Sequence, residues 1–135
     1  MIVTFLFVLS ALSFSGSVSA FGKHYRGPTG TCYFTKPTYS IGETMSIHAE
    51  GSFGAATKGS FEVVLKNPGG SVVTRFQQYL YDVYPNGFTD TVTYTLKPTD
   101  PTGTWTVELD YIVVTKRKVT TTLITMNEAL VNPLA

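Results

Sequence analysis

The feature that most constrains this chain is the recurrence of short segments in which apolar and polar residues alternate. The clearest examples are residues 44–50, 60–67, 88–96 and 104–114. In the first of them, Met45, Ile47 and Ala49 fall on one face. Successive side chains of a strand point to opposite faces, so such segments are typical of half-buried β-strands. Apolar residues nowhere recur at helical spacing for three turns, and the pattern therefore predicts an all-β protein.

Turn-forming residues separate these segments at short intervals. The turns are expected at 51–59, at 67–70, at 85–87 and at 98–103, where Gly, Pro and Asn gather. Two further segments at the ends, 31–34 and 118–126, and a longer one at 71–84 bring the expected strands to about seven. The 71–84 segment alternates less cleanly, which predicts a bend or a bulge. About seven short strands predict a single immunoglobulin-like antiparallel β-sandwich.

Composition agrees with this fold class and excludes some partners. The chain has 21 threonines, eight tyrosines and nine phenylalanines, residue types that favour strands. Its formal net charge is +1, which gives no electrostatic reason to expect nucleic acid or an anionic membrane surface as a partner. The one basic cluster, Lys116-Arg117-Lys118, predicts a solvated turn, with a phosphate or polyanion contact as the alternative.

The chain begins with a segment typical of a signal peptide. An apolar run from Ile2 to Leu12 is followed by small residues that end at Ala20, which predicts cleavage after Ala20 and secretion. The alternative is a retained membrane anchor. The expected organisation is a signal peptide at 1–20, an N-terminal arm at 21–30, a sandwich domain at 31–126 and a C-terminal tail at 127–135. Beyond the signal peptide, no segment is expected to cross a membrane.

Cys32 is the only cysteine, so no internal disulfide can form. It lies in an alternating segment, which predicts burial as a small apolar side chain. The alternative is an intermolecular disulfide through Cys32, as a secreted chain with one thiol allows.

A set of turn and core residues resembles that of macroglobulin-type immunoglobulin-like domains over roughly residues 37–126. The matching residues, in order, are Tyr39, Gly42, Glu43, Pro68, Gly69, Gly87, Phe88, Gly103 and Trp105. Physically, Gly42 and Gly103 predict a positive φ or a close backbone approach. Trp105 is expected as the central core aromatic, with a partner for its indole N–H. The resemblance implies a secreted or cell-surface protein of the kind found in surface layers, adhesins and extracellular filaments. Protease trapping is not implied, because Cys32 lacks a Cys-Gly-Glu-Gln context.

Residues suited to catalysis are sparse, and the prediction is that the protein is not an enzyme. His24 lies in the N-terminal arm and His48 on the expected solvent face of a strand. An enzyme would require His48 beside a carboxylate in a cleft. Asp100 is expected to cap its own turn, with calcium binding as the weaker alternative. No cofactor and no metal are predicted.

The candidate binding residues are aromatic. Four lie in residues 79–88, namely Tyr79, Tyr81, Tyr84 and Phe88, and Phe53 is expected to be exposed on a loop of small residues. Exposed rings could stack on sugars or anchor a protein. The competing interpretation is that half of those in 79–88 face the core.

The functional prediction is a secreted, non-enzymatic structural or interaction protein that binds a protein partner or itself. Open sandwiches have strand edges that a neighbour's terminal segment can complete, so a surface filament or layer subunit is one form of this prediction. The alternative is a small extracellular glycan- or protein-binding module that uses the Tyr79–Phe88 region.

Overall fold

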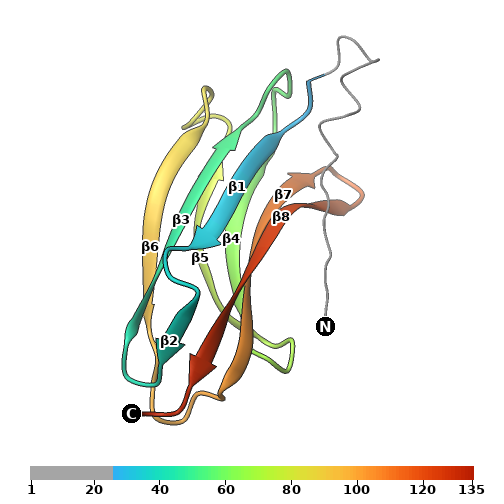
Figure 1. Ribbon diagram of the computed structural model, residues 1–135. Helices are drawn as coiled ribbons and strands as arrows, with labels where there is room; N and C mark the ends of the chain where they lie inside the picture. Colours follow the sequence, from blue (N-terminus) through green and yellow to red (C-terminus); the bar gives the residue numbers. More distant parts are fainter. Residues whose placement is uncertain (1–25) are drawn as a thin grey trace.

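The computed structural model describes residues 26–135, which form eight strands in two sheets (Figure 1). The strands are β1 (Thr29–Phe34), β2 (Thr38–Ser40), β3 (Thr44–Ser52), β4 (Ser60–Lys66), β5 (Val72–Leu80), β6 (Phe88–Thr95), β7 (Gly103–Val114) and β8 (Val119–Asn132). The predicted signal peptide at 1–20 and most of the predicted arm lie outside the described residues. Within residues 26–135 no helix has the length and apolarity that a membrane crossing requires.

One sheet has three strands in the order β1-β3-β6, and the other has five in the order β2-β8-β7-β4-β5. All pairings are antiparallel except that of β2 with β8. The two sheets lie face to face around a shared core. The fold is therefore the predicted all-β immunoglobulin-like sandwich, with one strand more than expected. That strand, β2, has only three residues, too few for a recognisable alternation.

The core is formed by the inward-facing residues of the alternating segments. Met45, Ile47, Phe61 and Trp105 are fully buried, as are several of their strand neighbours. The indole Nε1–H of Trp105 donates to the backbone oxygen of Pro101 at 2.9 Å, so the predicted partner exists. Because buried polar groups must be paired, this bond allows a tryptophan to occupy the centre of the core.

Two of the glycines adopt the backbone conformation expected of them. Gly42, in the turn before β3, has φ of 96°, and Gly103, the first residue of β7, has φ of 124°. L-residues with a Cβ rarely adopt these angles, so both positions favour glycine.

The long strand β8 differs from its predicted extent. It continues to Asn132, so the segment predicted as a C-terminal tail over 127–135 is mostly the second half of a strand. This half pairs with β7, and its last residues also pair with β2. Asn127 obscured the alternation because it is a polar residue among inward positions, where its Oδ1 accepts the N–H of Phe34 at 3.0 Å. The sandwich also begins earlier than predicted, since β1 starts at Thr29.

Candidate functional site

The outer end of the hairpin formed by β7 and β8 extends beyond the rest of the five-stranded sheet (Figure 1). The pairing of β4 with β7 stops at Ile112, and β2 reaches β8 only from Leu130 onward. Among residues 26–135, the segment from Val119 to Ile124 therefore has β7 as its one hydrogen-bonded neighbour. We call this segment the distal β8 edge.

The tip of the hairpin determines which backbone groups of the distal β8 edge are free. Thr115 N–H donates to the backbone oxygen of Lys118 at 2.9 Å and closes the hairpin. Because bonded and non-bonded pairs alternate in an antiparallel ladder, residues 120 and 122 bond to β7. Val119, Thr121 and Leu123 consequently direct their N–H and C=O groups away from β7. Such groups are the usual template for adding a strand from another chain.

Apolar side chains lie beside this edge on the outer face of the sheet. Val114, Val119, Leu123 and Met126 are 70%, 62%, 51% and 47% exposed, and we call them the distal apolar face. They share this face because β7 and β8 residues that pair point to the same side. Four large apolar side chains exposed together on one hairpin are typical of a contact surface.

A group of carboxylates borders the distal apolar face. Glu62 accepts from Arg75 at 3.0 Å, and Glu108 accepts from Lys66 at 2.9 Å. Asp110 lies between these carboxylates, is only 8% exposed, and takes part in none of the four ion pairs among the described residues. Burial, followed by the charge of Glu108, raises the pKa of Asp110 to about 6. The outer face thus holds a buried acid on which Lys66 acts with the opposite effect, although Lys66 is ion-paired with Glu108.

The other sheet edges are better protected against strand addition. The β5 edge is interrupted by register shifts, and β2 is very short. On β1, the N–H of Phe34 is bonded to Asn127. The β6 edge is regular, but its outward side chains are threonines, and the N–H of Thr91 is bonded to the carboxylate of Asp90 at 2.8 Å. Short length, bulges and side-chain capping are the usual protections of an edge. The distal β8 edge is regular from Val119 to Leu123, and its pairing with β7 shifts only at Ile124.

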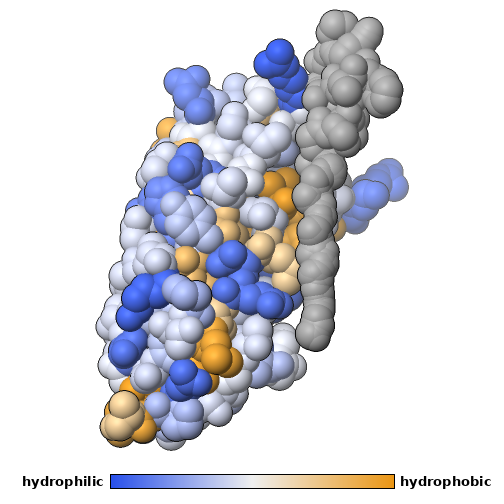
Figure 2. All heavy atoms as spheres, viewed as in Figure 1, coloured by the Kyte–Doolittle hydropathy of each residue, from blue (hydrophilic) through white to orange (hydrophobic). Residues whose placement is uncertain are grey.

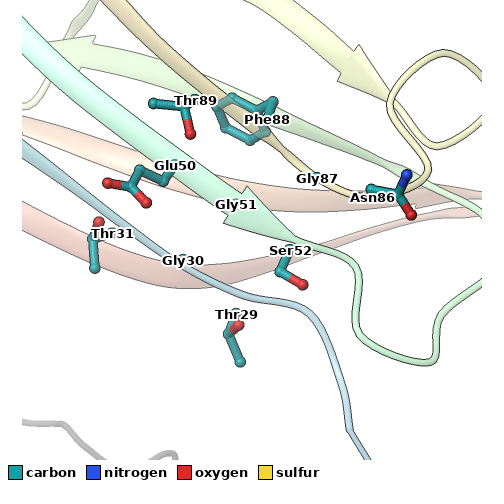
Figure 3. A pocket seen from close by; sticks show the side chains of 10 residues that line it. All are labelled: Thr29, Gly30, Thr31, Glu50, Gly51, Ser52, Asn86, Gly87, Phe88 and Thr89. Atoms are coloured by element: carbon teal, nitrogen blue, oxygen red, sulfur yellow. The ribbon is translucent and has the colours of Figure 1, made fainter.

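A polar hollow of about 420 Å³ lies at one end of the three-stranded sheet (Figure 3). Its side chains come from β1, β3, β6 and the turn before β6, and they are Thr29, Thr31, Glu50, Ser52, Asn86, Phe88 and Thr89. The glycines at 30, 51 and 87 complete the lining. Figure 2 shows hydrophilic and neutral residues over most of this side of the molecule. Glu50 is the only ionisable residue in the lining, so the hollow offers mainly hydrogen bonds.

His48 lies next to this hollow and not in it. Its Nε2 is 2.9 Å from Glu50 Oε2, and its ring lies 5.3 Å from that of Tyr33. The structure thus places His48 beside a carboxylate, on the outer face of β3 as predicted. No group of three or more His, Cys, Asp or Glu side chains within residues 26–135 is arranged to hold a metal ion. His24 lies outside the described residues.

The aromatic residues predicted to bind a ligand lie mainly in the core. Phe53, Tyr79 and Phe88 are 1%, 2% and 8% exposed, whereas Tyr81 and Tyr84 are half-buried. The expectation that Phe53 is exposed is wrong, because its loop folds over the core and places the ring 4.8 Å from that of Phe61.

Tyr79 and Phe88 are stacked at 3.9 Å between ring centroids, and the Tyr79 hydroxyl donates to the Asp90 carboxylate. Burial and this bond raise the pKa of Tyr79 well above its usual range. The competing interpretation, that half of these rings face the core, therefore holds for Tyr79 and Phe88. Their burial counts against a binding surface made of exposed rings.

Two other side chains behave as predicted. Cys32 is 3% exposed, and its Sγ lies 3.7 Å from the backbone oxygen of Val107. Burial raises the pKa of the Cys32 thiol far above its usual range, which disfavours the reactive thiolate and hence the alternative of an intermolecular disulfide. Asp100 caps its turn by accepting the N–H of Lys97 at 2.8 Å, and it also accepts from the Tyr94 hydroxyl.

The distal β8 edge was not found as a site from the sequence. The segment 118–126 was predicted only as a last strand. A signal was present, because residues 119–126 combine high β-propensity with no charge and no proline, directly after three basic residues. Whether this edge is paired depends on where β1 and β2 lie along β8, which the sequence does not state.

Comparisons with known proteins identify the fold and no family. No protein-family model and no curated protein matches the chain. A structure of the alkylpurine DNA glycosylase AlkC from Pseudomonas fluorescens, bound to DNA containing an abasic site analog, is similar with a TM-score of 0.54 at 9% identity. The match covers 86% of this chain and 33% of that one, so this chain spans about a third of the AlkC chain.

Two further structures show weaker likeness. The CARDB domain of a Pyrococcus furiosus protein has a TM-score of 0.46 at 10% identity, with 82% of this chain and 98% of that one covered. A type I cohesin of ScaB from Pseudobacteroides cellulosolvens has a TM-score of 0.42 at 12% identity, with 79% and 94% covered. Identities this low describe the architecture and carry no function across.

Proposed function

We propose that this protein is a secreted, non-enzymatic interaction module that binds a protein partner by adding a strand at the distal β8 edge. The observation that carries the proposal is the open backbone of Val119, Thr121 and Leu123, beside the distal apolar face. In strand addition, main-chain hydrogen bonds supply affinity, and alternate side chains supply specificity. The distal β8 edge offers both.

The non-enzymatic part of the proposal rests on the surroundings of His48. Among residues 26–135, the hydrogen-bond partner of its ring is Glu50, and no serine, threonine or cysteine joins this pair. A nucleophile held by a base would require such a contact. The pair lies on the outer face of the sheet, where the side chains of His48 and Glu50 are 21% and 54% exposed.

Secretion is proposed from the apolar run and the small residues before Ala20. Membership of the macroglobulin-type group of sandwiches is proposed from the turn glycines and from Trp105, which occupies the central core position that the resemblance implies. The intact mass of the exported protein tests the first point, since cleavage after Ala20 leaves a chain that begins at Phe21.

A role as a subunit of a surface filament or layer is a narrower form of the same proposal. The C-terminal segment cannot serve as the donated strand, because residues 127–132 are already paired within their own sheet. Assembly that does not use the N-terminal arm would therefore join edges that both belong to folded sandwiches.

The test is site-specific photo-cross-linking in the cell that makes the protein. A photoreactive amino acid replaces Leu123 on the distal apolar face or, as the matched control, Val72 on the β5 edge, which is 41% exposed. The proposal predicts discrete protein adducts from position 123 and none of the same mass from position 72. The absence of adducts at 123, or identical adducts at both positions, would contradict it.

A further inference from the structure

We propose that the partner at the distal β8 edge is a second copy of this chain, joined antiparallel with Thr121 of the two copies opposite each other. This inference rests on the proposed function and specifies its partner. It follows from three properties of the edge, namely its hydrogen-bond alternation, its side-chain pattern and its charges.

The alternation permits few registers. In an antiparallel pair, hydrogen-bonded residues face each other, so each free residue of one edge must meet a free residue of the other. The free residues are Val119, Thr121 and Leu123. Only the register that sets Thr121 against Thr121 uses all three on both copies, and it forms about six hydrogen bonds. This register also keeps the two outer faces on the same side.

The same register produces apolar cross-strand pairs. Val119 of one copy lies opposite Leu123 of the second copy, and the symmetry repeats this pair on the other side of the axis. These side chains are 62% and 51% exposed in the single chain. Val114 pairs with Val119 within each copy and extends the contact. Directly opposed apolar residues are the unit that stabilises a sheet, so the edge complements itself.

Charges are complementary across the same junction. The segment from Val119 to Asn127 has no charged residue, so no like charges oppose each other in the paired region. Beyond it, the basic tip of one hairpin, Lys116-Arg117-Lys118, comes level with β8 residues 124–126 of the second copy. Glu108 and Asp110 of the second copy lie on the adjacent strand β7. The tip therefore approaches Glu108 and Asp110. Asp110 takes part in none of the ion pairs found within residues 26–135.

The length of the junction is limited by the fold itself. β1 lies beside β8 at Thr125 and Asn127, which Cys32 and Phe34 contact. A second strand can therefore pair only along the distal β8 edge. A twofold junction of this kind is closed, so it gives a dimer. A filament would require a second contact elsewhere on the molecule.

Disulfide cross-linking of the purified full chain, as processed by its host, tests the register. Residue 121 of each copy is expected about 5.5 Å from its counterpart between Cα atoms, within the range that a disulfide spans. Thr121→Cys should therefore cross-link to a covalent dimer under mild oxidation. Thr93→Cys, at an exposed threonine of the β6 edge, should not, and neither should the wild type, because Cys32 is buried.

Proline variants test the junction independently, with light scattering to measure whether the protein is a dimer. Thr121→Pro removes a free N–H without removing a bond to β7, so it should abolish the dimer and leave near-ultraviolet circular dichroism unchanged. Thr93→Pro, which likewise removes a free N–H, on β6, should leave the dimer intact.

Each other outcome overturns the inference. If Thr121→Cys cross-links no faster than Thr93→Cys while position 123 still photo-cross-links to a different protein, the edge serves another partner, and the proposed function stands without self-association. If the dimer cross-link forms only after residues 21–25 are deleted, the chain's own N-terminal segment occupies the edge. If neither experiment gives an adduct, both the inference and the proposed function fail.

Discussion

The two ends of the hairpin formed by β7 and β8 show how the same pair of strands can serve as core or as contact surface. At the proximal end, Trp105, Val107 and Leu109 are fully buried, and β4 and β2 extend the sheet on either side. At the distal end, Val114, Val119 and Leu123 are exposed, and within residues 26–135 the edge of β8 pairs with no strand other than β7. Both ends have the β-branched and apolar residues of a strand. The difference teaches that neighbouring strands, more than local composition, determine which part of a strand is available to a partner.

The largest effect should follow from removing the core aromatic of the proximal end. Trp105→Ala leaves a cavity in a fully buried site, so it should lower the free energy of unfolding by about 3–5 kcal/mol. Urea denaturation followed by far-ultraviolet circular dichroism measures this loss. A change below about 1 kcal/mol would contradict the placement of Trp105 at the centre of the core.

A smaller effect should follow at the boundary between the two ends. Asp110 has its pKa raised to about 6, so the folded protein prefers the protonated form more than the unfolded chain does. Its contribution to stability is fully present below about pH 4 and is lost as the pH rises through about 6. Asp110→Asn should therefore raise the free energy of unfolding by about 1 kcal/mol at pH 8 and leave it nearly unchanged at pH 4.

Denaturation of both proteins from pH 4 to pH 8, at a concentration low enough to keep them monomeric, measures this difference. Asp82→Asn, at an exposed residue of the turn after β5, serves as a pH control. A gain of equal size at pH 4 and pH 8 would show that titration of Asp110 is not the cause.

The smallest effect on the single chain should follow at the distal end. Leu123→Ala removes an exposed side chain, so the free energy of unfolding of the monomer should change by no more than about 0.5 kcal/mol. The same substitution should weaken self-association, since it removes both copies of the Val119–Leu123 pair. Sedimentation measures the association and dilute thermal melts measure the monomer. A large loss of monomer stability would place Leu123 in the core of the fold.

The sequence predicted the strands and their inward faces correctly where apolar and polar residues alternate strictly. The inward residues of 44–50, 60–65 and 104–111 follow directly from a period of two, as does the burial of Cys32. The positive φ of Gly42 and Gly103 follows from the conformational freedom of glycine. The sequence did not predict burial where a side chain is covered only because a loop folds onto another element. Phe53 lies in a loop of small residues, and its burial follows only because that loop folds onto Phe61.

The candidate site could not be predicted from the sequence either, because the exposure of a strand edge also depends on other elements. Residues 119–126 have the composition of an ordinary strand, and nothing in them states that β2 pairs with β8 only from Leu130 onward. The second half of β8 was missed because Asn127 is satisfied by the N–H of a strand 93 residues away. Local patterns thus predict strands, whereas free edges depend on the relative lengths of strands distant in the sequence.

Amide hydrogen exchange, followed by NMR at high and low protein concentration, tests the central claim most directly. The account predicts that the amides of Val119, Thr121 and Leu123 are protected at high concentration and exchange rapidly on dilution. The amides of Thr120 and Thr122, which bond to β7, should remain protected at both concentrations. Exchange of the three edge amides that is equally fast at both concentrations would contradict the claim that the distal β8 edge joins two copies of this chain.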